Sequence, residues 1–137
     1  AFTTSKKKMD VLHNDPILGH ITTFGANPVI CASALETLKI VLNTKIMSHV
    51  INKEKLIRKI LIHKHITEIR GMGLMLSIIL KDNKIATKLV LNAKENGLIL
   101  FFLLIEKKAV RITPPLTIST NEIKQGCKII LDALDKT

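Results

Sequence analysis

The sequence predicts a small α/β fold in which a few strands are covered by helices. Two patterns favour this class: apolar residues recur at helical spacing in several stretches, and short apolar runs bounded by glycine or polar turns lie between the later ones. The 137 residues, of which 47% are hydrophobic, are enough for one domain with a buried core. This composition excludes a disordered chain.

The first 27 residues are expected to contain little regular structure. A short helix is predicted over residues 5–13, with Ser5 as its N-cap, and Pro16 prevents its continuation. A loop follows, and we expect the whole segment to be the tail of a larger domain. Because the chain begins with Ala-Phe rather than with Met, it fits a fragment or a processed product better than a complete translated protein.

A long helix is predicted over residues 28–50. Asn27 is a favourable N-cap, and Pro28 occupies the first helical position, where a missing N–H group costs nothing. A second helix is predicted over residues 53–64. Apolar residues at helical spacing predict one buried stripe along the long helix, made of Leu35, Leu38, Leu42, Ile46 and Val50.

The remaining residues alternate between predicted strands and helices. Strands are expected over residues 68–70, 74–80, 98–105 and 109–113, and helices over residues 83–96 and 120–134. Gly71-Met72-Gly73 is expected to form the turn between the first two strands. Gly97 is expected to end the helix before it, and the pair Thr120 and Glu122 is expected to open the last helix.

The formal net charge of +10 at pH 7 raises the question of a nucleic-acid partner. Eighteen of the 21 basic residues are lysines, and they are scattered rather than gathered into one stripe. The chain has four phenylalanines and neither tryptophan nor tyrosine, so no stacking surface for bases is visible. We therefore expect no nucleic-acid partner and keep a basic nucleic-acid-binding α/β module as the weaker alternative.

The two cysteines and the lengths of the apolar runs bear on the cellular compartment of the protein. Cys31 and Cys127 each lie in an apolar helical pattern and are expected to be buried free thiols in a reducing cytoplasm. The longest apolar stretches, residues 71–80 and 98–105, are too short to cross a bilayer, and residues 1–8 lack the apolar core of a signal peptide. We expect a cytoplasmic protein with no membrane partner.

The loop before the long helix contains the sequence TTFG at residues 22–25. The hydroxyls of Thr22 and Thr23, together with the N–H groups of a glycine-containing loop at a helix start, can donate to a phosphate. The alternative is that the hydroxyls satisfy the backbone of the loop itself. Both interpretations stay open on these residues alone.

Arg111 is one of only three arginines in a chain that otherwise uses lysine. It lies on a predicted strand just before the rigid pair Pro114-Pro115. A guanidinium can hold a carboxylate with two parallel hydrogen bonds, which lysine cannot imitate. The alternative is an ordinary salt bridge on the strand.

Three other groups of residues carry weaker signals. Gly71 and Gly73 form a Gly-x-Gly pair, but no third glycine follows at dinucleotide spacing, which favours a turn. His63 and His65 have no cysteine or acidic ligand beside them at metal spacing, so a solvated helix end is expected there. His20 could order the threonine loop by hydrogen bonding. We assign no catalytic residue and no metal ligand.

Four motifs, in order and in register, resemble the class III aminotransferases, the group that includes the ornithine and acetylornithine enzymes. They are GHITTFGANP (residues 19–28), IRGMGLM (69–75), NGLI (96–99) and VRITPPL (110–116), and the resemblance covers essentially the whole chain. It implies the C-terminal part of a fold-type I enzyme that uses pyridoxal 5'-phosphate (PLP). It further implies that residues 1–27 are the tail of the PLP-binding large domain with the phosphate-contacting loop, residues 28–50 the long connecting helix, and residues 51–137 the small C-terminal domain with a short, mainly antiparallel sheet.

The resemblance also implies roles for three residues. Thr23, with Thr22 beside it, matches the position whose hydroxyl and N–H contact the PLP phosphate, across the interface of a homodimer. Arg111 matches the arginine that holds the α-carboxylate of the amino-acid or 2-oxo-acid substrate. The family commonly has glycine where Ala26 stands, which matters if that position needs a positive φ angle.

In this family, the lysine that forms the Schiff base with PLP lies upstream of the matched segment. None of the lysines in this chain stands in the matching context. We therefore expect a portion of an aminotransferase that moves an amino group between an amino acid and a 2-oxo acid and that is inactive alone, because PLP chemistry requires this lysine. The alternative is a non-catalytic folded remnant of a degraded gene.

Overall fold

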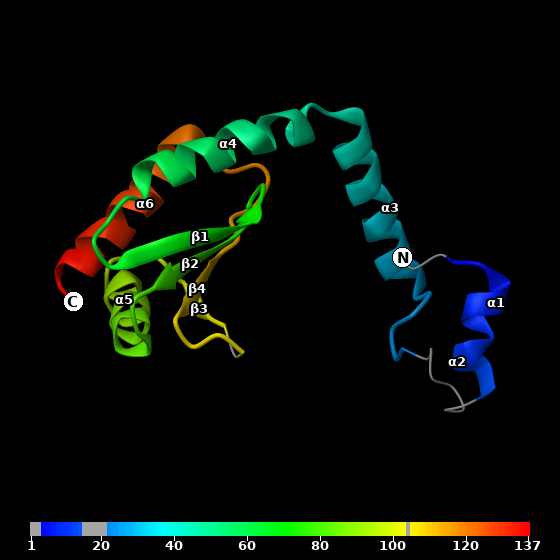
Figure 1. Ribbon diagram of the computed structural model, residues 1–137. Helices are drawn as coiled ribbons and strands as arrows, with labels where there is room; N and C mark the ends of the chain where they lie inside the picture. The colour runs from blue at the N-terminus through cyan, green and yellow to red at the C-terminus, as the bar shows by residue number, and fades with distance from the viewer. Residues whose placement is uncertain (1–3, 15–21, 104) are drawn as a thin grey trace. The chain divides into compact units, whose positions relative to one another are not determined.

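The computed structural model describes residues 4–14, 22–103 and 105–137. The chain divides into two compact units, Ala1–Asn43 and Thr44–Thr137, which are described separately (Figure 1). No helix among the described residues is long and apolar enough to cross a membrane.

The first unit contains two short helices and one longer one. The helix predicted over residues 5–13 is interrupted at Asp10 and forms α1 (Lys6–Met9) and α2 (Val11–Asn14). Ser5 does stand at the N-cap of α1 with an extended backbone, but its side chain makes no capping hydrogen bond. Three consecutive lysines make up most of α1, and like charges crowded into one turn disfavour a longer helix.

The longer helix, α3 (Pro28–Asn43), begins where the sequence predicted but ends early. Asn27 is confirmed as its cap, because its Oδ1 accepts hydrogen bonds from the N–H groups of Val29 and Ile30 at 3.0 and 3.4 Å. The predicted continuous helix over residues 28–50 is wrong, since it stops at Asn43 and α4 begins at Ile46. The Thr44 hydroxyl accepts from the Ile46 N–H at 3.4 Å, and a side chain that bonds the backbone in this way competes with the helical ladder.

The predicted buried stripe of the long helix is also wrong over most of its length. Leu35, Leu38 and Leu42 are between 51% and 71% exposed, and Ile46 is half-buried; only Val50 is buried. Cys31, expected to be buried, is exposed as well. The helical period was right, but burial needs a packing partner, and no residue of α3 is buried within the part of the first unit that the structure describes.

The second unit has a four-stranded antiparallel sheet with three helices, in agreement with the predicted α/β class (Figure 1). The strands are β1 (Ile66–Met72), β2 (Met75–Leu80), β3 (Phe101–Phe102) and β4 (Ala109–Ile112), in the spatial order β1-β2-β4-β3. The helices are α4 (Ile46–Ile60), α5 (Asn83–Glu95) and α6 (Thr120–Asp135). The helix predicted over residues 53–64 is therefore α4, which begins and ends earlier than expected.

One hydrophobic core joins the three helices to one face of the sheet. Cross-strand pairs on this face, Leu76 with Ile112 and Ile78 with Val110, are buried or half-buried. Alternating side chains of a strand point to opposite faces, so Ser77 and Arg111, which pair with each other, lie on the other face. The helices contribute the rest of the core, including Ile57, Leu89, Ala93, Ile123, Ile130 and Leu134.

Capping residues set the end of α5 and the start of α6. Gly97 has a φ of +82°, and the N–H groups of Gly97 and Leu98 bond the carbonyls of Lys94 and Ala93, which is a Schellman motif. Leu98 therefore belongs to the end of α5, and the strand predicted over residues 98–105 shrinks to Phe101–Phe102. The last helix, α6, begins at Thr120 as predicted, and its cap is Ser119, because Ser119 and Glu122 bond each other's backbone N–H groups in a capping box.

A turn does join β1 and β2, but it lies at Gly73-Leu74 rather than at the predicted Gly71-Met72-Gly73, because Gly71 and Met72 still belong to β1. Gly71 has a φ of +112°, and a β-carbon there would lie 2.1 Å from the carbonyl oxygen of Met75. Gly73 also has a positive φ, +62°. Only glycine fits both requirements at Gly71, so Gly71 allows the close approach of β1 and β2, whereas a β-carbon at Gly73 would lie 2.8 Å from the Val50 side chain of α4.

Candidate cofactor- and substrate-binding residues

The loop before α3 presents both predicted phosphate ligands to solvent. Thr22 and Thr23 are exposed, and the loop closes as a turn in which the Gly25 N–H donates to the Thr22 carbonyl oxygen at 3.3 Å. Within the described part of the chain, neither threonine hydroxyl forms a hydrogen bond. The loop's own hydrogen bonds, as far as they are described, therefore leave these hydroxyls available for a ligand.

Gly25 leaves room for the Thr22 hydroxyl. A β-carbon at Gly25 would lie 2.4 Å from Thr22 Oγ1, which is closer than two non-bonded atoms can approach. The hydroxyl thus occupies a space that only glycine leaves open. A hydroxyl in this position can donate to a phosphate oxygen.

Ala26 has a φ of +58°, the left-handed conformation that favours glycine. This is the position where the resembling family commonly has glycine, so the structure gives a physical reason for that preference. The substitution by alanine leaves the loop conformation in place at a cost in strain.

The start of α3 itself offers few free donors. Asn27 already accepts from the N–H groups of Val29 and Ile30, so an anion at this helix start would rely on the threonine hydroxyls and the loop backbone. The first turn contains no acidic residue that would repel an anion.

Arg111 lies at the middle of β4 on the face of the sheet that is not part of the core. It pairs with Ser77 of β2 on one side and with Phe101 of β3 on the other. Its Cζ atom is 5.2 Å from the centre of the Phe101 ring, a cation–π distance. A hollow beside it is lined by Arg70, Gly71, Met75, Leu76, Ser77, Leu103 and Arg111.

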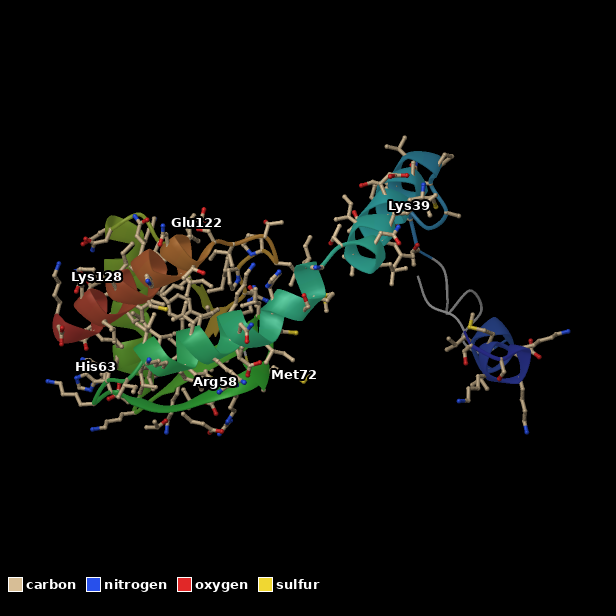
Figure 2. All side chains as sticks on the ribbon, turned by 90° about the horizontal axis from the view of Figure 1, so that it is seen from above. Lys39, Arg58, His63, Met72, Glu122 and Lys128 are labelled. Carbon is tan, nitrogen blue, oxygen red and sulfur yellow. The ribbon has the colours of Figure 1, made fainter. Side chains whose placement is uncertain are left out.

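The three arginines of the chain differ in what their guanidinium groups bind. Arg58 on α4 pairs with Glu54 and donates to two carbonyls of β1 at 2.5 and 2.8 Å (Figure 2). Arg70 pairs with Glu68 at 2.8 Å. No acidic side chain among the described residues lies within ion-pair distance of Arg111. The predicted alternative of a strand salt bridge therefore has no partner in the described part of the chain.

The threonines and Arg111 lie in different units. Thr22 and Thr23 belong to Ala1–Asn43, and Arg111 belongs to Thr44–Thr137. His20, predicted to order the threonine loop, falls outside the described residues.

The histidines between α4 and β1 form a structural contact, and the predicted solvated helix end is wrong. Both rings are half-buried, with centres 5.2 Å apart. His63 Nδ1 accepts from the His65 N–H at 3.2 Å, so a neutral His63 carries its proton on Nε2 and donates it to Asp135 at 3.1 Å. Burial, followed by the charge of Lys64, lowers the pKa of His65. The described residues contain no group of three or more potential ligands for a metal ion.

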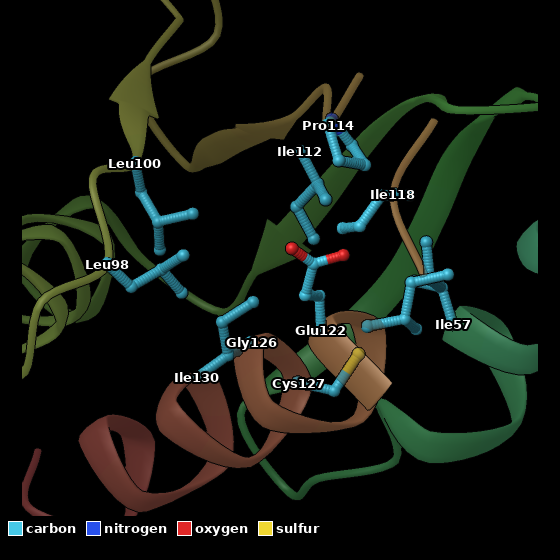
Figure 3. Close-up of a pocket in the computed structure, with 11 residues that line it drawn as sticks. Ile57, Leu98, Leu100, Ile112, Pro114, Ile118, Glu122, Gly126, Cys127 and Ile130 are labelled. Carbon is cyan, nitrogen blue, oxygen red and sulfur yellow. The ribbon is translucent and has the colours of Figure 1, made fainter. Parts of the chain in front are cut away.

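An apolar pocket lies between α6, α4 and the sheet, as Figure 3 shows. Its lining includes Ile57, Leu98, Ile112, Ile130 and the thiol of Cys127. Burial raises the pKa of Cys127 to about 11, so the thiol stays protonated and unreactive near neutral pH. This pocket contributes packing rather than chemistry.

Sequence reasoning missed Phe101 and the pair of Glu54 and Arg58. The pair carries a signal, because an acid and a base four residues apart lie on one helix face. Phe101 carries no comparable signal, since its contact with Arg111 depends on the register between two strands, which the sequence pattern does not fix.

Comparison with known protein families gives a match over almost the whole chain. A model of the family described as "Aminotransferase class-III" matches residues 1–134. An acetylornithine aminotransferase of Caldanaerobacter subterraneus is 34% identical over 122 residues, which make up 85% of this chain and 30% of that protein. An acetylornithine/succinyldiaminopimelate aminotransferase of Buchnera aphidicola is 36% identical over 124 residues, with the same two shares. The chain thus spans about 30% of the length of these relatives.

Solved structures give the same result. An aminotransferase of Bacillus anthracis has a TM-score of 0.73 and 30% identity, and the match covers 86% of this chain and 30% of that one. An ornithine aminotransferase of Toxoplasma gondii, solved with partial occupancy of PLP, has a TM-score of 0.71 and 28% identity over 92% of this chain and 30% of that one.

Proposed function

Because the chain belongs to the class III aminotransferase family, we propose that it forms the C-terminal portion of a PLP-dependent aminotransferase. This enzyme would move an amino group between an amino acid and a 2-oxo acid. The names of the relatives point to ornithine or acetylornithine as amino-acid substrates to be tested first. The observation that carries the proposal is Arg111, a guanidinium on the open face of the sheet with no acidic partner among the described residues.

Arg111 would bind the α-carboxylate of the substrate. The N–H groups of a guanidinium lie in one plane and match the two oxygens of a carboxylate, which fixes the orientation as well as the position of the substrate. The guanidinium groups of Arg58 and Arg70 are already bonded to carboxylates, so they are poorer candidates. The carboxylate is shared by amino acids and 2-oxo acids, so one arginine would serve both half-reactions.

Thr22 and Thr23 would hold the phosphate of PLP. The exposure of both threonines, and the room that Gly25 leaves for the Thr22 hydroxyl, support this assignment. When bound, PLP supplies an electron sink for the carbon that carries the amino group. The threonines would contribute only anchoring, and in a homodimer they would anchor the cofactor of the partner subunit.

The residues of this chain do not include a candidate for the lysine that carries PLP. We propose that activity requires the preceding segment, of which residues 1–27 would be the tail, and that Thr44–Thr137 provides the small domain. The connecting segment would then comprise α3 and the first turn of α4. Free Cys31 and Cys127 support a reducing compartment, and we propose the cytoplasm.

The proposal is tested by producing the chain together with the segment encoded before it. We expect the longer protein to retain the visible absorbance of bound PLP after gel filtration and to transfer an amino group from ornithine or acetylornithine to a 2-oxo acid. The 137-residue chain alone should do neither. Upstream sequence without a glycine-rich segment that contains a lysine, or a longer protein that folds but neither binds PLP nor transfers the amino group, would support the degraded remnant instead.

The anchoring role has its own test in the same protein. Thr22→Val and Thr23→Val should weaken PLP binding, measured as a dissociation constant by absorbance titration. The matched control is Thr37→Val, because the Thr37 hydroxyl only bonds the Ser33 carbonyl within α3 at 2.9 Å. Equal PLP affinity in all three variants and in the parent would overturn the assignment of the threonines.

A further inference from the structure

Phe101 and Arg111 face each other across the two neighbouring strands β3 and β4. They are directly paired in the antiparallel ladder, a position that brings the β-carbons about 5 Å apart on one face of the sheet. The Cζ of Arg111 lies 5.2 Å from the centre of the ring. On the other side of Arg111, the next paired residue is Ser77. Of the two residues that pair with Arg111, Phe101 is thus the large apolar one.

Burial does not explain the phenylalanine at this position. The Phe101 side chain is 55% exposed, and it belongs to a chain with only four phenylalanines and no other large aromatic residue. Its strand is two residues long, so it contributes little to the sheet. An exposed ring on such a strand gains energy from the side chains that it touches, and Arg111 is one of them.

Contact with a ring restrains an arginine without using its hydrogen-bond donors. A cation–π contact is made through the flat face of the guanidinium, whereas a carboxylate binds the N–H groups at its edge. The two other arginines are held differently, since Arg58 and Arg70 use edge N–H groups on Glu54 and Glu68. Arg111 is the arginine whose restraint leaves the edge available for a second ligand.

We propose that Phe101 is a positioning residue that orients the guanidinium of Arg111 for the substrate carboxylate. The inference rests on the proposed function, in which Arg111 binds that carboxylate. The ring covers one face of the guanidinium, excludes water from it and limits rotation about the end of the side chain. The carboxylate then meets a guanidinium whose plane is already set, so less side-chain freedom is lost on binding.

The contact can be observed without any activity. In the 137-residue chain, the side-chain protons of Arg111 should show an upfield ring-current displacement in the NMR spectrum. The displacement should persist in Phe101→Tyr and disappear in Phe101→Leu. It should remain in the matched control Phe102→Leu, because Phe102 pairs with Val110 instead. Identical Arg111 shifts in the parent chain and in Phe101→Leu would overturn the proposal at this step.

The effect on binding is measured in the longer protein that contains the preceding segment. Phe101→Leu should raise the KM for the amino-acid substrate about two- to fivefold, the range of an exposed cation–π contact, with little change in kcat. Phe101→Tyr should restore the KM, and the KM for an amine that lacks the carboxylate should stay at the parent value. Equal effects on the amino acid and on the amine would mean a merely structural role and would overturn the proposal.

The two proposals fail in different ways. If the longer protein has no aminotransferase activity, the proposed function fails, and the ring-current result alone decides whether the contact exists. If the protein is active and Arg111→Lys raises the KM for the amino acid while Phe101→Leu does not, only the role of Phe101 is overturned.

Discussion

The carboxylate of Glu54 on α4 accepts a hydrogen bond from the backbone N–H of Gly73, with Oε2 and N 2.6 Å apart. Its other oxygen accepts from Arg58 Nε at 2.8 Å, and Arg58 donates in turn to two carbonyl groups of β1. Two residues one helical turn apart thus hold the β1–β2 hairpin against α4. Because β2 pairs with β4, this contact also fixes the part of the sheet that carries Arg111.

This contact predicts an acid-sensitive contribution to stability. The hydrogen bonds from Arg58 and then from Gly73 lower the pKa of Glu54 below its ordinary value of 4.5. A carboxyl group whose pKa is lower in the folded state stabilises the fold above the unfolded value, and this stabilisation is lost as the pH falls through the folded value. Glu54→Gln should therefore lower the Tm at neutral pH, and the difference from the parent should shrink below pH 4.5. Circular dichroism melts over this pH range measure it.

The control for this experiment is Glu36→Gln. Glu36 pairs only with Lys39 on the surface of α3, so its replacement should leave the melting of the second unit unchanged at every pH. A Tm deficit in Glu54→Gln that is independent of pH would contradict the assigned electrostatic cause.

Glycine positions predict opposite effects of one substitution. Gly126 lies inside α6, and a β-carbon there would meet no atom within 4 Å, so Gly126→Ala should stabilise the protein by about 1 kcal/mol through helix propensity. Gly71→Ala should destabilise it by about 2 kcal/mol or more, because its φ of +112° and the Met75 carbonyl both oppose a side chain. Urea unfolding gives both values, and a stabilised Gly71→Ala would mean that β1 and β2 do not approach closely at Gly71.

The loop before α3 predicts a stabilising change in the other direction. Ala26 has a φ of +58°, so Ala26→Gly should relieve backbone strain and stabilise the first unit by up to about 1 kcal/mol. Ala34→Gly, in the middle of α3, should instead cost about 1 kcal/mol of helix propensity. The urea dependence of the far-ultraviolet circular dichroism signal gives the free energy of unfolding of each variant, and these two values are compared. A loss of similar size in both variants would show that Ala26 is not strained in solution.

The sequence was sufficient for the features that depend on local chemistry. Asn27 before Pro28 predicted the start of α3, and Gly97 predicted the end of α5, because caps depend on single residue types at fixed offsets. The apolar run over residues 74–80 likewise predicted strand β2, because short apolar runs bounded by turn residues favour buried strands.

The sequence was not sufficient where the outcome depends on partners. Leu38 has the right spacing for a buried stripe, but the described residues of its unit supply nothing to bury it. The contact of Phe101 with Arg111 depends on strand register, and the orientation of His63 depends on Asp135, 72 residues away. Local patterns carry no information about such distant pairings.

The two cysteines predict a simple chemical difference. Cys31 is exposed, whereas Cys127 is 4% exposed and its pKa is raised to about 11 by burial. At pH 8, a thiol-specific reagent should therefore modify one cysteine of the folded chain quickly and the second only after denaturation. Cys127→Ala should abolish the reaction that requires denaturation, and Cys31→Ser should abolish the fast reaction of the folded chain. Two equally fast reactions would show that the core around α6 opens readily.

Arg111 gives the sharpest prediction for function. Arg111→Lys keeps the positive charge but loses the planar pair of donors, so in the longer protein it should reduce kcat/KM for an amino-acid substrate by about tenfold to a hundredfold. The loss should appear mainly in KM and should be absent for an amine without a carboxylate, because in the proposed role only the carboxylate would meet the guanidinium. The control Arg70→Lys lies on the same face of the sheet, but its guanidinium is bonded to Glu68, so kcat/KM should stay near the parent value. Equal losses in the two variants would show that the charge of this face matters and that Arg111 has no specific grip on the substrate.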